Sequence, residues 1–174
     1  MPTIEAISTT YLEADTASVT FSSIPATYEH LQLRFSAKST DTSMEVDWPV
    51  LTFNADTGNN YSFHYMYGTS TLKGAGRVAS QVLKLYRITT AKPSVDSALY
   101  GTICLDILDY RNTNKNTTIQ SIGSGPQSSP YLVINFQSGL WDNTAAVTSI
   151  ALTLSSGDDY ARGSEFTLYG LKSS

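Results

Sequence analysis

The sequence has few charged residues and almost no cysteine. Asp, Glu, Lys and Arg make up 15% of the 174 residues, against roughly 25% in an average soluble domain. The 11 Lys and Arg residues form no run or stripe and the net charge is -4, so the basic surface that nucleic-acid binding requires is missing. Cys104 stands alone and cannot form an internal disulfide; its apolar neighbours predict a small buried side chain.

Long hydrophobic runs are also missing. No apolar stretch approaches the roughly 18 residues of a membrane-spanning helix, and the first residues have neither the basic nor the apolar part of a secretory signal. We therefore expect no membrane partner and synthesis in a cytoplasm. The hydrophobic content of 41% suffices for one core without metals or disulfides, so residues 1–174 are expected to form a single domain.

The sequence also lacks the apolar stripe of an amphipathic helix. Apolar and polar residues instead alternate as they do in β-strands. Leu31, Leu33 and Phe35 alternate with polar residues, as Ile150 and Leu152 do near the C-terminus, and successive side chains of a strand point to opposite faces. Roughly 8–10 short strands at this spacing predict an all-β antiparallel sandwich, jelly-roll-like first and immunoglobulin-like second. We expect one core to contain Leu31, Leu33, Phe35, Ile103, Leu105, Ile150, Leu152 and Phe166.

Glycine and proline mark the expected breaks. The strands are predicted at residues 3–13, 18–21, 31–38, 48–53, 61–67, 81–89, 98–110, 117–122, 131–136 and 145–155, with a closing strand near 163–170. Turns or loops are predicted at 54–60, 73–76, 123–130 and 138–144, because Gly, Pro, Asn and Asp favour turn conformations. Leu132, Ile134 and Phe136 share one phase of their strand.

No catalytic or cofactor-binding pattern occurs. His30 and His64 have no metal-ligand spacing, and Asp106 and Asp109 fall on opposite strand faces. The glycines at 74–76 and 123–125 lack a dinucleotide fingerprint and a nucleophile elbow. The run at Asp56 has oxygen ligands for calcium but no EF-hand glutamate, so a plain turn is favoured. We expect no enzyme, cofactor or metal.

The aromatic residues are the remaining candidates for binding. The run of Tyr61, Phe63, Tyr65 and Tyr67 is interpreted first as a sheet face packed on the second sheet, and second as a stacking platform for sugars. Three separate residues are candidate partner contacts, although each also fits a core position: Trp48, Trp141 and Tyr169.

Residues 24–34, 53–64, 138–141, 149–152 and 163–170 together resemble small virion proteins of tailed bacteriophages, most closely head decoration (cement) proteins. The resemblance implies a jelly-roll domain, often trimeric, that binds major capsid subunits on the capsid surface. It assigns no individual binding residue. Two other classes stay open: a tail-fibre, tail-tip or collar module that binds a glycan, and a glycan lyase or hydrolase, which would need a carboxylate or histidine cluster that the sequence lacks.

Overall fold

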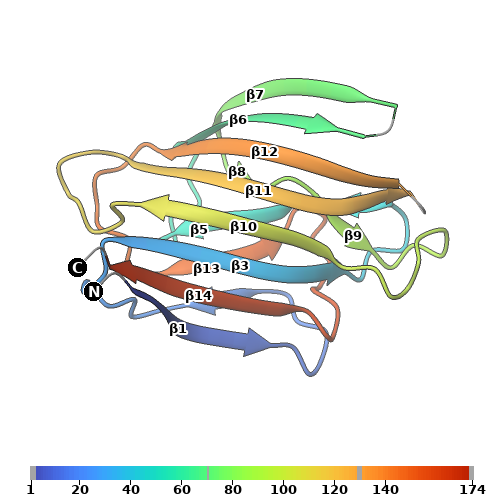
Figure 1. The fold of residues 1–174 in the computed structure, drawn as a ribbon, viewed down its shortest axis with the longest axis horizontal. Helices are drawn as coiled ribbons and strands as arrows, with labels where there is room; N and C mark the ends of the chain where they lie inside the picture. Colours follow the sequence, from blue (N-terminus) through green and yellow to red (C-terminus); the bar gives the residue numbers. More distant parts are fainter. Residues whose placement is uncertain (1–2, 70, 129–130, 173–174) are drawn as a thin grey trace.

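The chain folds into a sandwich of two antiparallel β-sheets in the computed structural model, which describes residues 3–69, 71–128 and 131–172 (Figure 1). The large sheet has the order β1 (Thr3–Tyr11), β14 (Glu165–Lys172), β3 (His30–Ser39), β10 (Gly101–Leu108), β11 (Thr117–Ser128), β12 (Tyr131–Trp141), β6 (Tyr61–Gly68) and β7 (Lys73–Gln81). The small sheet has the order β2 (Val19–Phe21), β13 (Ile150–Leu154), β5 (Pro49–Phe53) and β8 (Leu83–Lys84).

Two short strands complete the architecture. β9 (Ile88–Thr90) pairs in parallel with β3 and antiparallel with β4 (Val46–Asp47). The described residues contain no helix, and hence none long and apolar enough to cross a membrane. The all-β sandwich is therefore confirmed, whereas jelly-roll connectivity stays a prediction. The described residues contain fourteen strands in place of the expected eight to ten, because pieces such as β4 and β8 have only two residues each and β7 begins where a turn was predicted.

The core lies between the two sheets, with the small sheet behind the large one in Figure 1. All eight residues expected to share a core are in it, and Leu31, Leu33, Leu105, Ile150, Leu152 and Phe166 are fully buried. Phe35 stacks on Phe166 with ring centroids 5.2 Å apart. The period-two pattern thus identified the buried face of β3, β10, β13 and β14, because one face of each strand packs on the other sheet.

Two expected breaks in the large sheet are wrong and a third is wrong in part. Residues 73–76 begin β7 and residues 123–128 continue β11; positions 129 and 130 lie outside the described residues. In the turn predicted at 138–144, residues 138–141 end β12, whereas 142–144 lie outside any strand. In β7 the glycines lie beneath aromatic rings, since a Cβ on Gly74 would lie 2.7 Å from the Tyr67 ring and one on Gly76 2.7 Å from the Tyr65 hydroxyl. Glycine in these strands makes room for a close neighbour and does not end the strand.

The turn after β5 is as expected. Asn54 and Ala55 have left-handed φ angles of 51° and 57°, and the Asp56 carboxylate accepts the Gly58 amide at 2.9 Å. Asn54 also accepts the amides of Thr148 and Ser149, at 2.8 and 3.1 Å. The turn therefore ties the β5–β6 connection to the entry of β13.

Candidate functional site

The outer face of the large sheet, which points away from the small sheet, carries a row of apolar side chains. Strand register places Ala75 opposite Met66, Met66 opposite Phe136, Phe136 opposite Ile122, and Ile122 opposite Cys104. This apolar row crosses five strands, from β7 to β10. Because directly opposed side chains in a sheet lie about 4.5–5.5 Å apart at Cβ, the row forms one continuous strip.

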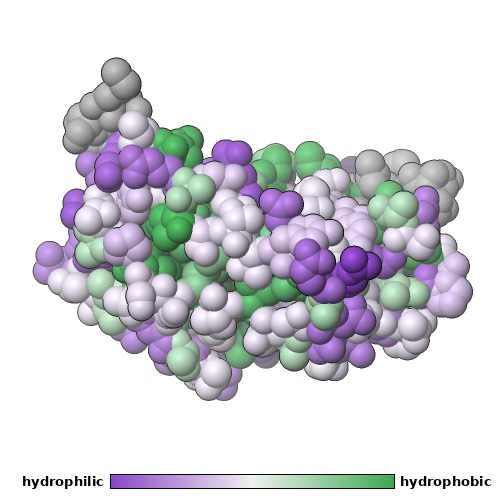
Figure 2. Space-filling view, turned by 90° about the horizontal axis from the view of Figure 1, so that it is seen from below, coloured by the Kyte–Doolittle hydropathy of each residue, from purple (hydrophilic) through white to green (hydrophobic). Residues whose placement is uncertain are grey.

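The strip is unusually exposed. Met66 is 56% exposed, Phe136 50% and Ile122 44%, and Ile134, two residues before Phe136 on the same face of β12, is 52% exposed. Scattered apolar residues on a surface need no explanation, but a contiguous apolar patch marks a contact site. By contrast, the side of the molecule seen from the β1 edge is mainly hydrophilic, with hydrophobic groups in small separate areas (Figure 2).

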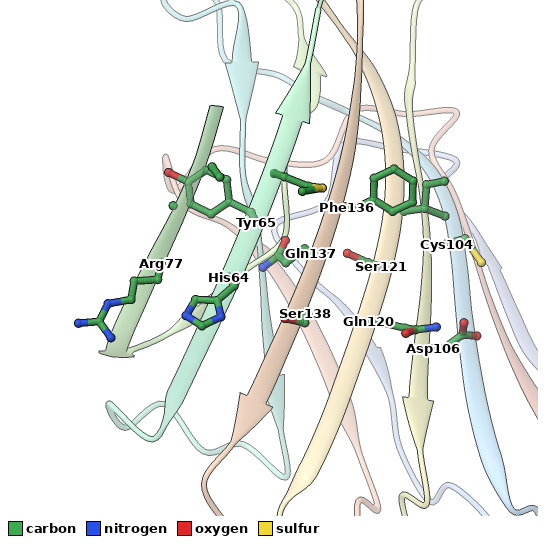
Figure 3. A pocket seen from close by; sticks show the side chains of 14 residues that line it. His64, Tyr65, Arg77, Cys104, Asp106, Gln120, Ser121, Phe136, Gln137 and Ser138 are labelled. Atoms are coloured by element: carbon green, nitrogen blue, oxygen red, sulfur yellow. The ribbon is translucent and has the colours of Figure 1, made fainter. Parts of the chain in front are cut away.

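A polar row runs beside the apolar row. Register places Arg77 opposite His64, His64 opposite Ser138, Ser138 opposite Gln120, and Gln120 opposite Asp106. Figure 3 shows this order across the strands, next to Phe136 and Cys104. The two rows line a hollow of about 920 Å³ on the outer face. The surface therefore combines apolar contact area with hydrogen-bonding groups at its border, as protein interfaces do.

The polar row continues onto β3 and β14. Gln32 donates to Asp106 at 2.6 Å and accepts from Arg34 Nε at 2.6 Å. The Arg34 guanidinium lies over the Tyr169 ring, 5.2 Å from its centroid. These contacts hold the polar side chains in place at the edge of a second hollow, of about 510 Å³, which Ile134 and Tyr169 also line.

Cys104 lies in the apolar row, half-buried on the outer face, whereas the sequence predicted a small core residue. Its phase explains the difference: Ile103 and Leu105 on either side point into the core. Burial, and next the Asp106 carboxylate, raise the pKa of the Cys104 thiol above its ordinary value. The thiol is therefore protonated at neutral pH and acts as a further apolar surface group.

The three candidate contact aromatics lie in different places. Trp141 is 1% exposed, packs 5.4 Å from Phe53 between ring centroids, and donates its indole N–H to Asp56 at 2.8 Å. Of the two roles open for Trp141, the structure thus places it in the core. Trp48 is half-buried beneath the Arg87 guanidinium, and Tyr169 is half-buried on the outer face. The structure does not bring the three together.

Tyr61, Phe63 and Tyr65 of the β6 run pack inward, as the first of its two interpretations expects, whereas Tyr67 stacks on Tyr65 and Tyr86 outside the core. Tyr61 and Phe63 are buried and pack in the core with Tyr65 against it. The Tyr61 hydroxyl accepts the Phe53 amide at 3.0 Å and donates to the Asp56 carbonyl at 2.9 Å. Burial raises the pKa of Tyr61 to about 12. These rings therefore do not form an exposed platform on the outer face.

The remaining polar candidates are engaged by protein groups. Asp56 accepts hydrogen bonds from Asn60 and Trp141, which, with the Gly58 amide, lower its pKa below the ordinary value. The Asp109 amide donates to His30 Nδ1 at 3.0 Å, and Asp109 also pairs with Lys115. Within residues 3–69, 71–128 and 131–172, no three His, Cys, Asp or Glu side chains lie together as metal ligands.

Sequence reasoning missed the outer-face residues on β12. Ile134 and Phe136 share the apolar phase that predicts a buried face, yet they point outward, and Asn135 and Gln137 point inward at 2% and 4% exposure. The sequence did contain a sign that the inner face of β12 is polar. Asn135 and Gln137 occupy the alternate positions of this strand, and the neighbouring strand β11 is also partly polar. Comparison of the chain with protein-family models, with curated proteins and with solved structures finds no match.

Proposed function

We propose that this protein is a structural protein of tailed-bacteriophage virions, most specifically a decoration protein that binds and stabilises the major capsid lattice. Its domain is taken to have jelly-roll connectivity, to be made in the host cytoplasm and to lie on the capsid surface. The resemblance of residues 24–34, 53–64 and 163–170 supports this proposal. The single structural observation that carries it is the exposed apolar row on the outer face.

The apolar row is suited to a contact that forms only on a partner. Met66, Phe136 and Ile134 each keep about half of their surface in water, so covering them would contribute about 1 kcal/mol per residue. The polar row adds directional hydrogen bonds that fix the orientation of the partner. Interface energy is concentrated in a few buried anchors, and Phe136 is the central aromatic of this surface. The proposal assigns no chemical step to the protein.

A matched pair of methionine substitutions tests the surface. Met66 is 56% exposed in the apolar row and Met44 is 52% exposed in the β3–β4 loop. Wild-type protein should bind capsids that lack it and raise their heat tolerance, because binding only the assembled state stabilises that state. Met66→Asp should weaken co-sedimentation with capsids at least about tenfold, since a charge must be desolvated in an apolar contact. Met44→Asp should behave as wild type.

Two outcomes would redirect the proposal. Capsids that neither bind the wild-type protein nor gain stability from it would refute the cement role and move the protein to the tail or collar.

We also propose a homotrimer, because the low charge fraction and 11 tyrosines favour interfaces. If Met66→Asp converts the trimer into monomers in light scattering, the outer face belongs to self-association and not to capsid binding.

A tail-fibre, tail-tip or collar module is the second candidate function. The observation that favours it is the placement of Ser138, Gln120 and His64 beside the exposed Phe136 ring, because glycan sites combine an aromatic face with hydrogen-bonding side chains. Cryo-electron microscopy of intact particles distinguishes the two candidates by showing whether the protein lies on the head or on the tail.

A further inference from the structure

A smaller hollow, of about 250 Å³, opens on the other side of the large sheet. The large sheet ends in β6 and β7 and the small sheet ends in β8, and the hollow lies where these ends meet. Trp48, Tyr65, Tyr67 and Tyr86 form its aromatic walls. The two β6 tyrosines point to the face of that strand opposite the outward His64 and Met66, because successive side chains of a strand alternate. Tyr65 and Gln137 also border the hollow on the outer face.

Aromatic stacking fixes these walls. The Tyr86 ring lies 5.7 Å from that of Tyr65 and 5.4 Å from that of Tyr67, measured between centroids. The Arg87 guanidinium lies 4.9 Å from the Tyr86 centroid and 5.7 Å from those of both Tyr67 and Trp48. The hollow is therefore preformed, which reduces the entropy lost when a ligand binds.

Among the residues that the structure describes, three polar atoms at this hollow are buried without a hydrogen-bond partner: Tyr86 Oη, Arg87 Nε and Gln137 Oε1. Tyr86 is 6% exposed and Gln137 is 4% exposed. Gln137 donates its Nε2 to the Lys84 carbonyl at 2.6 Å, which orients the amide and leaves Oε1 as the free acceptor. Buried polar groups are almost always partnered, so three in one place indicate a ligand that supplies the partners.

The charges and unpaired polar atoms of the lining indicate which chemical class of ligand fits the hollow. Arg87 and Lys84 are cations, and the described lining residues include no carboxylate, although the whole chain has a net charge of -4. Lys84 Nζ makes a long 3.4 Å contact with Ser155 Oγ. An anion is thus favoured, whereas Gln137 Oε1 requires a donor that a simple carboxylate lacks. The tyrosine walls favour an apolar C–H face, and the volume admits a single small ring.

We propose that the hollow between β6, β8 and the Tyr86–Arg87 segment binds one hexuronic acid residue, free or within an acidic polysaccharide. Its carboxylate pairs with Arg87 and Lys84, one hydroxyl donates to Gln137 Oε1, and another pairs with Tyr86 Oη. Its C–H face packs on the tyrosine walls. This assignment goes beyond capsid binding and does not depend on it.

The test is calorimetric titration of the full chain with glucuronate and galacturonate, with glucose and acetate as matched probes. At least one uronate should bind, at least tenfold more tightly than glucose or acetate. Tyr86→Phe should weaken that binding at least tenfold without lowering the melting temperature of the free protein, because no described residue pairs with its hydroxyl. Tyr169→Phe, on the outer face, is the control and should bind as wild type.

Lys84→Met tests how much the lysine charge contributes to binding, separately from the contact of the sugar ring with the tyrosine walls. It keeps the aliphatic stem and the backbone carbonyl that holds Gln137, and it should reduce the preference for uronate over glucose. Absence of uronate binding, equal binding of acetate, or unchanged affinity in Tyr86→Phe would each overturn the proposal. None of these results would alter capsid binding by wild type or by Met66→Asp, so failure here is distinct from failure of the cement role.

Discussion

The link between Asp56 and Trp141 should contribute strongly to stability, and Asp56→Ala tests it. The carboxylate accepts Asn60 Nδ2 at 3.0 and 3.2 Å, the Trp141 indole N–H at 2.8 Å and the Gly58 amide at 2.9 Å. Removing it disrupts the turn and leaves a buried indole N–H on a residue that is 1% exposed. We expect a loss of about 2–4 kcal/mol in the free energy of unfolding.

Urea unfolding followed by tryptophan fluorescence measures this loss, with Asp158→Ala in the exposed turn after β13 as the control. Asp56→Asn keeps one acceptor for the indole and should lose about 1–2 kcal/mol. If the unfolding free energy of Asp56→Ala lies within about 0.5 kcal/mol of wild type, the indole hydrogen bond does not stabilise the fold.

The same link predicts a dependence on acid pH. Hydrogen bonds from Asn60 and Trp141 lower the folded pKa of Asp56 below its ordinary value of 3.8. The stabilisation is therefore complete above about pH 4 and is lost as the pH falls from there through the folded pKa. The difference in unfolding free energy between wild type and Asp56→Asn should shrink over that window and stay constant from pH 5 to 8.

Three further changes test the core and the close contacts. Leu152→Ala should cost about 2–5 kcal/mol, since Leu152 is fully buried in β13; an unchanged urea midpoint would contradict its core position. Gly170→Ala should cost about 1–3 kcal/mol, because its Cβ would lie 2.3–2.5 Å from the Tyr28 ring; wild-type stability would show that the ring moves freely. Burial raises the pKa of Tyr61 to about 12 from 10.0, so its contribution is present below pH 10 and lost as the pH rises through 12; Tyr61→Phe should show a smaller alkaline loss in thermal melts.

The phase of β12 shows why alternation alone predicted only part of the candidate site. Alternation identifies two faces but not which one meets the second sheet. In β3 and β10 the apolar phase is buried, whereas in β12 the apolar phase of Ile134 and Phe136 is exposed and Gln137 faces inward. On that inner face Gln137 donates a hydrogen bond to the Lys84 carbonyl at the end of the small sheet. This hydrogen bond stabilises a polar side chain at a buried position.

The glycine-rich strands of the large sheet show the same limit. Gly123 and Gly125 predicted a loop, but both lie in β11. A Cβ on Gly125 would lie 3.3 Å from the Arg87 carbonyl, and one on Gly101 would lie 2.8 Å from Ile88 Cα. Arg87 and Ile88, where β9 begins, lie close against β11 and β10 at these points. The glycines permit that approach, and the sequence contains no local sign of a contact with residues this far away in the chain.

The sequence by itself determined the strand-forming character of the chain, the polar turn at 54–60 and the buried faces of β3, β10, β13 and β14. These follow from local side-chain chemistry, since period-two alternation and Asn, Asp and Gly turns act over a few residues. Only the tertiary structure decided the apolar row and the tyrosine-walled hollow. Both depend on register between strands distant in sequence and on where the narrower small sheet ends, because these determine which side chains are opposed and which remain in water.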